Sequence, residues 1–493
     1  MEYLLGIDIG TGSTKAVAVG LGGETLSVHQ VYNDTKSTQG GFAEQDPEAI
    51  WIAFKTCLLT FYDKLSIQPL AISLSSAMHG LILADEHNEL LSPMITWADS
   101  RSAAIAARIK DSEAGKWLYE RTGTPIHAMS PLCKIIWFRE NQPALFEKLH
   151  RVFSIKEYIW YKLFAEFAVD HSIASSTGLF NIHSLEWDSQ ALELAGIFKE
   201  QLSTLVQTDY TRSGLELRDQ SLSAFASTQF VIGASDGCLA NLGSLAIEPG
   251  IAALTIGTSG AVRVASRIPI INYPAMTFNY VLDNEFFICG GAVNNGGSAV
   301  QWLLKNIFGE SELTEIVYTQ LFKRISQVEA GSDSLLFLPY LSGERAPLWD
   351  SDSCGTFFGL RLHHSRPQLA RAVLEGICFT LYEVLQVVES NGEAITQLNV
   401  SGGFVQSEVW MQILADITGK KLVLIQEEDA SAIGAVILAA KTLKLNLSLN
   451  DKNLHSILPN IANHETYQKI FPIFKALYLS LKPLMKQLQQ LNH

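Results

Sequence analysis

The sequence has little cysteine and no long apolar stretch, and both absences narrow the class of protein. Its six cysteines, at positions 57, 133, 238, 289, 354 and 378, include no Cys-x-x-Cys pair, so we expect buried thiols rather than a disulfide framework or a zinc site. No run of 18 apolar residues occurs, which predicts no membrane-spanning helix. The N-terminus lacks the basic segment of a signal peptide, so we expect a soluble, cytoplasmic protein.

Positive charge is also scarce. Lys and Arg together number 36 against 50 Asp and Glu, and the formal net charge is −14. Nucleic acids and anionic membranes select basic surfaces, so we expect neither as a partner. An anionic substrate would have to be held by local cations and backbone N–H groups, against the field of the whole chain.

Two common nucleotide-binding motifs are missing. No Gly-x-x-x-x-Gly-Lys-Ser/Thr sequence occurs, which excludes a P-loop. The Gly10-Thr11-Gly12 segment lacks the third glycine of a dinucleotide-binding fingerprint, and Asp8 stands inside the strand that precedes it. A nucleotide site in this chain must therefore be built in another way.

The first twenty residues carry the most informative pattern. An apolar run over residues 3–9, broken by Asp8, ends in Gly10-Thr11-Gly12-Ser13, and a second apolar run follows over residues 16–19. This pattern predicts two short strands joined by a glycine turn. Such a turn leaves backbone N–H groups uncovered and can cradle a phosphate, with Asp8 facing a metal ion and Lys15 adding a cation. An ordinary glycine-rich hairpin is the alternative.

The same pattern recurs in the second half of the chain. The segment Leu254-Thr-Ile-Gly257-Thr-Ser-Gly260-Ala-Val-Arg-Val264 again joins two apolar runs by a glycine turn, and Gly257 follows Gly10 by 247 residues, half the length of the chain. A chain of 493 residues is expected to form roughly two to four domains. The repeat therefore predicts a duplicated domain, with one copy over residues 1–245 and the other over residues 246–493.

Local signals place several helices. Asp46 followed by Pro47 predicts a helix start, because Asp is a good N-cap and Pro suits the first helical position. Ser365, with Pro367 in the first turn, predicts another. The stretch over residues 467–491 predicts one or two Leu/Lys helices.

Three segments carry polar groups at the ends of expected strands. His79 lies at a glycine break between strands, where it either faces a ligand or is a satisfied core histidine. Asp236 follows a buried strand and is either a catalytic acid in a cleft or a turn residue that bonds its own backbone. Gly402-Gly403 forms a third glycine turn before a helix, a position suited to nucleotide contact.

A fourth segment combines an acid and a base. Asp99 and Arg101 lie beside Trp97, just before an Ala-rich helix expected over residues 102–110. They are either contacts for a ligand or part of a capped helix start, with Asp99 near the positive end of the helix.

Two long segments resemble the signatures of the FGGY carbohydrate kinases, which belong to the actin/hexokinase-like superfamily. The resemblance also covers the opening Asp8 segment and the glycine turns at Gly257 and Gly402, so it spans nearly the whole chain. The two signature segments read Met129-x-Pro131-x-x-Lys134-Ile-x-Trp137-Phe-x-Glu140-Asn141 and Gly355-x-Phe-x-Gly359-Leu360, then seven residues, then Gln368-Leu-x-x-Ala372-Val-Leu-Glu375.

The resemblance implies two α/β domains of the actin/hexokinase-like (ribonuclease H-like) type, which flank a cleft for ATP and sugar. It implies ATP against the C-terminal half, the sugar against the N-terminal half, Asp236 as general base and Asp8 as a Mg²⁺ ligand through water. A carboxylate with a near-reference pKa suffices for that base, because phosphoryl transfer demands mostly alignment and charge neutralisation. Members of the family often form homodimers.

The resemblance also assigns the binding residues. The phosphates would contact Thr11, Gly12, Ser13, Lys15, Gly257, Thr258 and Ser259; the nucleotide would be bounded by Gly297, Gly402, Gly403 and Ser407; and the sugar would contact Met78, His79, Gly80, Asp99, Arg101 and Asp236.

The short motifs around these positions favour gluconate as the substrate. They resemble the gluconate kinases of the family, and Gly237 stands where xylulose kinases usually carry Asn, whereas Gly80 is the form typical of xylulose kinases. Gluconate is a carboxylate, and four cationic side chains are expected near the pocket. These are Arg101, His127, Lys134 and Arg345. The alternatives are a pentulose kinase, such as a xylulokinase, and a non-catalytic actin-like nucleotide sensor or assembly protein.

Overall fold

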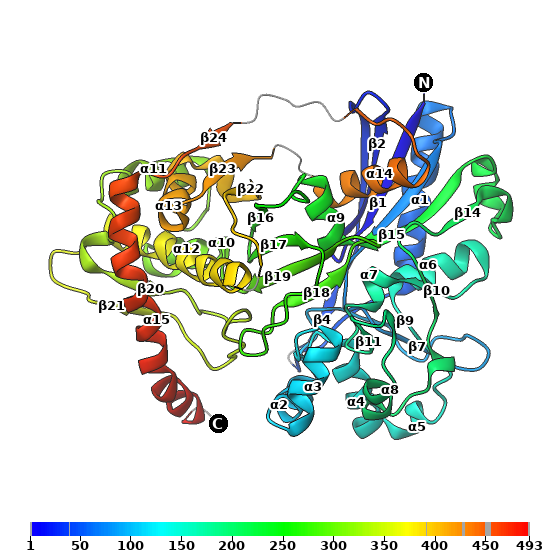
Figure 1. Cartoon of the computed structure of the whole chain (residues 1–493), viewed down its shortest axis with the longest axis horizontal. Helices are drawn as coiled ribbons and strands as arrows, with labels where there is room; N and C mark the ends of the chain where they lie inside the picture. The colour runs from blue at the N-terminus through cyan, green and yellow to red at the C-terminus, as the bar shows by residue number, and fades with distance from the viewer. Residues whose placement is uncertain (1, 39, 391, 426–428, 449–454, 492–493) are drawn as a thin grey trace.

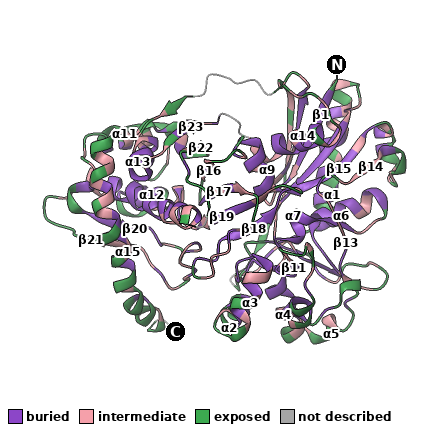
Figure 2. Cartoon of the chain, in the orientation of Figure 1, coloured by how far each residue is buried: buried purple, intermediate pink, exposed green. Residues whose placement is uncertain are grey.

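The computed structural model describes residues 2–38, 40–390, 392–425, 429–448 and 455–491. It consists of two α/β halves with a mixed sheet at the centre of each (Figure 1). Helices flank both sheets, and buried residues concentrate on the strands and on the helix faces that meet them (Figure 2). No described helix is long and apolar enough to cross a membrane.

The N-terminal sheet has six strands. β1 pairs antiparallel with β2 and parallel with β6, and β6 pairs parallel with β15. In spatial order the strands are β14 (Thr211–Ser213), β15 (Gln229–Ser235), β6 (Ala71–Ser76), β1 (Tyr3–Ile9), β2 (Ser13–Gly20) and β3 (Thr25–Tyr32). The predicted opening hairpin is thereby confirmed.

The C-terminal sheet repeats this topology. β16 pairs antiparallel with β17 and parallel with β22, and β22 pairs parallel with β23. In spatial order the strands are β18 (Phe278–Val281), β19 (Phe287–Val293), β17 (Gly260–Ser266), β16 (Ile251–Ile256), β22 (Gln397–Ser401), β23 (Lys421–Leu424) and β24 (Ser456–Ile457). Five strands in each sheet thus follow one order, as the sequence repeat predicts.

Alternation along β1 explains how helices cover both faces of the N-terminal sheet. Tyr3 and Leu5 pack in one cluster with side chains of α1 (Pro47–Leu65) and α6 (Ile155–Phe164), while Leu4 packs on the opposite face. That opposite face is covered by α14 (Ala430–Thr442), a helix of the second half of the chain. The helix approaches closely because Gly6 has no side chain: a Cβ there would lie 2.0 Å from the Ala432 carbonyl oxygen.

The C-terminal sheet packs mainly against long helices. α12 (Arg366–Ser390) lies on β17 and β19, and α13 (Glu408–Thr418) packs on α12 and contacts β23. α15 (Ile461–Gln490) is one continuous helix that starts six residues before the stretch predicted from sequence and contains two prolines. Ser365 bonds Gln368 before α12, and Asp46 caps α1 as predicted.

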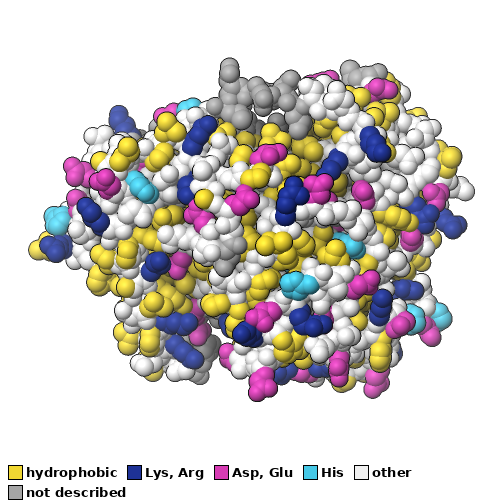
Figure 3. Space-filling view, viewed as in Figure 1, with side chains coloured by type: hydrophobic (Ala, Val, Ile, Leu, Met, Phe, Trp, Pro, Cys, Tyr) yellow, Lys and Arg dark blue, Asp and Glu magenta, His cyan; other side chains and the backbone are white. Residues whose placement is uncertain are grey.

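The remaining helices and strands lie outside the two central sheets. The shorter helices are α2 (Ala103–Lys110), α3 (Glu113–Thr122), α4 (Pro131–Asn141), α5 (Pro143–Phe146), α7 (His171–Ala174), α8 (Ser189–Ala195), α9 (Asp236–Gly243), α10 (Gly297–Trp302) and α11 (Glu315–Ile325). The shorter strands are β4 (Lys36–Ser37), β5 (Ala43–Gln45), β7 (Ile82–Ala84), β8 (Met94–Ile95), β9 (Arg151–Phe153), β10 (Ala168–Asp170), β11 (Phe180–Asn181), β12 (Glu186–Trp187), β13 (Thr204–Val206), β20 (Leu336–Leu338) and β21 (Thr356–Phe358). On the surface seen in Figure 3, charges of both signs are interspersed.

Candidate active site

The turn of the first hairpin is tied to both halves of the molecule. The Gly10 N–H donates to the Ser13 carbonyl over 2.9 Å, which closes the turn. The Thr11 hydroxyl accepts a hydrogen bond of 3.0 Å from Trp97 Nε1. Lys15 forms an ion pair with Asp429, immediately before α14. The lysine that we expect at the phosphates therefore has a carboxylate partner in this structure.

Asp8 lies at the wall of a hollow of about 150 Å³ beneath this turn. Its Oδ1 accepts a hydrogen bond of 2.6 Å from the Ser75 hydroxyl. Enclosure of the carboxyl raises its pKa, and the charge of Asp429 adds to that effect, while Ser75 and Lys15 oppose it. Two carboxylates at one hollow form a donor set of the kind that Mg²⁺ prefers, so the residues present fit this ion.

The second hairpin turn is one residue shorter and is closed by a similar hydrogen bond. The Gly257 N–H donates to the Ser259 carbonyl over 2.9 Å, and the Gly297 N–H donates to the Gly257 carbonyl over 2.7 Å. Gly402 has a φ of +100°, and a Cβ there would lie 2.4 Å from the Ile256 carbonyl oxygen. The three glycine segments of the C-terminal half therefore meet at one place.

Some of these glycines leave open space in front of the backbone. A Cβ built on Gly12, Gly257 or Gly403 would meet no atom within 4 Å. The Thr258 carbonyl accepts from the Ser298 N–H over 3.2 Å. Ser407 is buried and caps α13 through a 3.2 Å bond from the Trp410 N–H, so its hydroxyl serves the helix in this structure.

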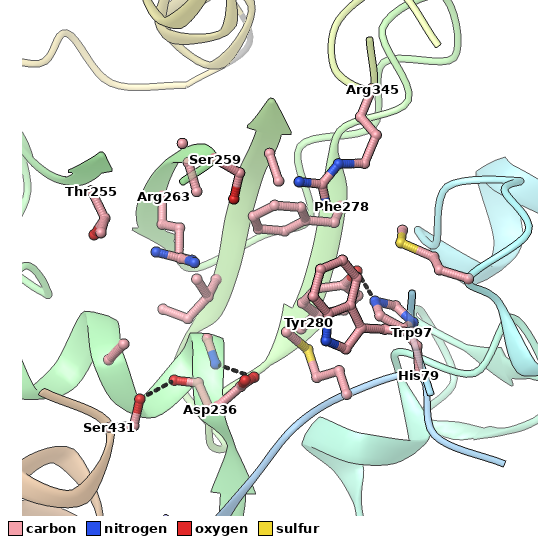
Figure 4. A pocket seen from close by; sticks show the side chains of 18 of the residues that line it. His79, Trp97, Asp236, Thr255, Ser259, Arg263, Phe278, Tyr280, Arg345 and Ser431 are labelled. Carbon is pink, nitrogen blue, oxygen red and sulfur yellow. Dashed lines mark hydrogen bonds between the residues drawn. The ribbon is translucent and has the colours of Figure 1, made fainter. Parts of the chain in front are cut away.

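A cavity of about 380 Å³ lies beside the second hairpin (Figure 4). Both halves of the chain contribute to its wall, and Ser431 lines both this cavity and the hollow beside Asp8. The lining residues are Met78, His79, Trp97, Met129, Asp236, Gly237, Ala240, Thr255, Gly257, Ser259, Gly260, Ala261, Arg263, Phe278, Tyr280, Ile288, Ala292, Arg345 and Ser431.

Asp236 reaches this cavity from the first position of α9, directly after β15. Its Oδ1 accepts a hydrogen bond of 2.7 Å from the Gly237 N–H. The pKa of Asp236 is raised to about 7, mainly by enclosure and also by the nearby charge of Asp8, against the Gly237 hydrogen bond and the positive charge of Arg263. The carboxyl therefore titrates well above the near-reference pKa that sequence reasoning considers sufficient.

His79 forms another part of the wall. Its Nδ1 lies 2.7 Å from the Ser176 carbonyl, which can only accept, so Nδ1 carries the proton and Nε2 accepts from the Tyr280 hydroxyl over 3.2 Å. Burial lowers the pKa of His79 to about 3, so the ring is neutral. The histidine is fully hydrogen-bonded, as a satisfied core histidine would be, and it also lines the cavity.

Met78 lines the cavity beside His79, whereas Gly80 is not a lining residue. Asp99 and Arg101 are also outside it. Arg101 pairs with Asp99 over 2.8 Å and with Glu44, and its guanidinium lies 4.0 Å from the Phe42 ring centroid. The two side chains are 0 and 3% exposed, so the pair serves the packing of the loop that carries Trp97.

The four cations expected near the pocket also divide into residues that line the cavity and residues that lie outside it. Lys134 is buried and donates to the carbonyl oxygens of His79 and Thr96, each over 2.7 Å, while burial lowers the pKa of His127 to about 4. Of the four, only Arg345 lines the cavity. Arg263 also lines it and was missed from the sequence, where it reads as one polar residue inside an apolar strand.

Known proteins resemble this chain over both of its halves. Residues 3–243 match the N-terminal domain of the FGGY family of carbohydrate kinases, and residues 252–443 match its C-terminal domain. Over 451 residues the chain is 41% identical to the gluconokinase of Bacillus subtilis (strain 168), covering 89% of this chain and 87% of that protein.

Two solved structures from Lactobacillus acidophilus share the fold. A ligand-bound xylulose kinase superimposes with a TM-score of 0.93 at 32% identity, covering 99% of this chain and 100% of that one. A gluconate kinase superimposes with a TM-score of 0.91 at 32% identity, covering 97% and 98%. The predicted two-domain α/β fold and the predicted ATP-dependent transfer of phosphate to a sugar are confirmed. The chain belongs to the FGGY family of carbohydrate kinases.

Proposed function

We propose that the chain is a gluconokinase, which transfers the γ-phosphoryl group of ATP to the 6-hydroxyl of D-gluconate. The observation that carries this proposal is the charge of the cavity wall. Asp236 is the one acidic side chain among its described lining residues, whereas two arginines face the same space. The 41% identity to a gluconokinase supports the same substrate.

Asp236 is the proposed general base. Because Oδ1 is held by the Gly237 N–H, Oδ2 is left to accept the proton of the attacking hydroxyl. A base whose pKa is near the working pH is well matched to this task. Loose phosphoryl transfer then depends mainly on alignment and on neutralisation of the phosphate charge.

His79 and Tyr280 are proposed to orient the acceptor. The Tyr280 hydroxyl donates to His79 Nε2, so its lone pairs face outward and can accept a hydrogen bond from a sugar hydroxyl. Met78 and Trp97 would provide apolar contact on the same side. The loop that carries these residues is held by Lys134.

The glycine turns are proposed to hold the nucleotide. The space at the missing side chains of Gly12, Gly257 and Gly403 is open, so phosphate oxygens can approach the backbone there. Asp8 would hold Mg²⁺, directly or through water, and the ion would neutralise charge on the phosphates. In this proposal residues 1–245 supply the sugar site and the base, and residues 246–493 supply most of the nucleotide site.

Coupled ADP release with D-gluconate, D-xylulose, L-ribulose and glycerol tests the substrate. We expect the highest kcat/KM with D-gluconate. The likeness to a solved xylulose kinase supports a pentulose kinase as the alternative. Such an enzyme would turn over D-xylulose and would not phosphorylate gluconate. Absence of ADP release with every sugar would favour a nucleotide sensor.

A further inference from the structure

Arg263 points its side chain into the cavity from the middle of β17. It alternates with Val262 and Val264, which belong to the main hydrophobic core, so the strand presents Arg263 on the opposite face. Ala261 and Ala292 line the cavity from the same region and take little space. Figure 4 shows the guanidinium between Ser259 and Asp236 with no partner drawn to it.

Arg345 reaches the same cavity from a loop of the C-terminal half. Its Nε donates to Asn294 Oδ1 over 2.7 Å and one terminal nitrogen donates to the Val293 carbonyl over 3.1 Å, so both acceptors are neutral. The adjacent Glu344 carboxyl accepts from backbone N–H groups and from Asn295. Within the described part of the chain, neither Arg263 nor Arg345 forms an ion pair.

The two guanidinium groups are close enough to repel each other. Enclosure lowers the pKa of both. The charge of Asp236 opposes this effect at Arg263 and the charge of Glu344 opposes it at Arg345, while the positive charge of Arg263 adds to it at Arg345. Two like charges that face one enclosed space without an ion pair among the described residues are costly unless a ligand supplies the negative charge. Arginine is also the residue best suited to bind a carboxylate with two parallel hydrogen bonds.

We infer that Arg263 and Arg345 form the subsite for the carboxylate of the acceptor and thereby select a sugar acid over a neutral sugar. This inference rests on the proposed function and deepens it. The hydroxyl to be phosphorylated would meet Asp236, while the acid end of the molecule would meet the two guanidinium groups in the same cavity.

Gly237 keeps the approach to this subsite open. A Cβ at this position would lie 3.6 Å from Arg263 Nε and 2.9 Å from Met78 Cε. A larger side chain beside Asp236 would therefore press on Met78 and fill space next to the guanidinium. The absence of a side chain at residue 237 is part of the same selection.

Binding and turnover are measured separately, so that the inference and the proposed function can fail independently. Calorimetric titration with D-gluconate in the absence of nucleotide measures binding, and ADP release with D-gluconate and D-xylulose measures turnover. The variants are R263Q, R263K and R345Q. R267Q is the matched control, because Arg267 carries the same charge but stacks on Phe286 outside the cavity. Thermal unfolding establishes that each variant is folded.

We expect R263Q and R345Q to weaken gluconate binding about 10- to 100-fold, the range for loss of a charge-assisted hydrogen bond. The ratio of kcat/KM for gluconate over D-xylulose should fall by a similar factor, R263K should recover part of the loss, and R267Q should match the unsubstituted enzyme. R263K and R345Q keep the test open should R263Q fail to fold.

Three results would overturn the inference: unchanged gluconate binding in R263Q or, should it not fold, in R345Q; equal losses with gluconate and D-xylulose; or a higher KM for ATP with unchanged gluconate binding, which would assign the arginines to the nucleotide phosphates. Failure of the unsubstituted enzyme to phosphorylate gluconate would refute the proposed function. In that event, gluconate binding lost in the arginine variants would still support the carboxylate subsite, and no binding at all would reject it.

Discussion

The two glycine hairpins share one scaffold but differ in what their strands carry. Each turn is closed by an N–H to carbonyl hydrogen bond of 2.9 Å, from Gly10 to Ser13 in the first and from Gly257 to Ser259 in the second, which is one residue shorter. In the first hairpin Asp8 stands opposite Lys15, whereas the corresponding pair in the second is Thr255 and Ala261. The acid and the cation are therefore confined to one copy of the repeat.

The cross-strand pair two positions further from the turn, on the same face of the sheet, shows a second difference. Gly6 stands opposite Val17 in the first hairpin, and Ala253 stands opposite Arg263 in the second. Val17 is 1% exposed and packs beneath α14, while Arg263 faces the cavity. One sheet thus buries this strand position under a helix, and the other leaves it free to bind a ligand. Duplication supplies the scaffold, and the covering of each face decides where chemistry can occur.

The largest expected effect is the loss of activity on removal of the proposed base, which lies outside both hairpins. Asp236→Asn should lower kcat about 10²- to 10⁴-fold, the usual contribution of a general base, with little change in thermal stability. ADP release with the best acceptor measures it. Asp209→Asn, at an exposed loop position, is the control. Full activity in the Asp236 variant would remove this residue from the mechanism.

A pair of substitutions tests whether the two hairpins really differ in function. Asp8→Asn should reduce activity or Mg²⁺ affinity about 10- to 100-fold, as loss of a group that holds a metal or its water typically does. Thr255→Ala, at the corresponding place in the second hairpin, should leave the Mg²⁺ dependence unchanged. Titration of activity against Mg²⁺ distinguishes them, and equal effects would show that the copies share the metal.

The pH profile should report the raised pKa of Asp236. The base acts when ionised, so kcat/KM for the acceptor should be half its maximum at an apparent pKa of about 7, approach a plateau about one pH unit above it, and fall about tenfold for each pH unit well below it. An inflection near 4 would show that enclosure and the charge of Asp8 do not perturb this carboxyl in the working enzyme.

The smallest effects distinguish two neighbouring glycines. Gly402→Ala should lower the free energy of unfolding by about 1–3 kcal/mol, because its φ is positive and a Cβ would meet the Ile256 carbonyl. Gly403→Ala should change it by no more than about 0.5 kcal/mol and instead raise the KM for ATP. Denaturant unfolding and ATP titration test the pair, and equal destabilisation by both would contradict the geometry.

Much of the fold was predictable because its signals are local. The hairpins and the helix starts at Asp46 and Ser365 depend on residues close together in the sequence, and the repeat is visible as two similar short segments. The packing of α14 on the first sheet was not predictable, since it joins segments more than four hundred residues apart. It depends on close backbone contact at Gly6, and Gly434 lets the same helix approach α9 (Asp236–Gly243) equally closely; composition reveals neither contact.

The site was predictable in its turns and less so in its charged side chains. Arg101 and Lys134 are cations in the right segments, but stacking and carbonyl contacts turn both away from the cavity. Arg263 could be found only once the register of β17 and the uncovered face were known. The general reason is that charge identifies a candidate, while its partners decide whether the charge is available to a ligand.

Phosphorus-31 NMR of a reaction with ATP, Mg²⁺ and D-gluconate tests the central claim most directly. We expect the γ-phosphate signal of ATP to decline while the signal of a phosphomonoester at carbon 6 of gluconate grows by an equal amount. No phosphomonoester with gluconate, together with a stoichiometric phosphomonoester when D-xylulose replaces it, would contradict the account.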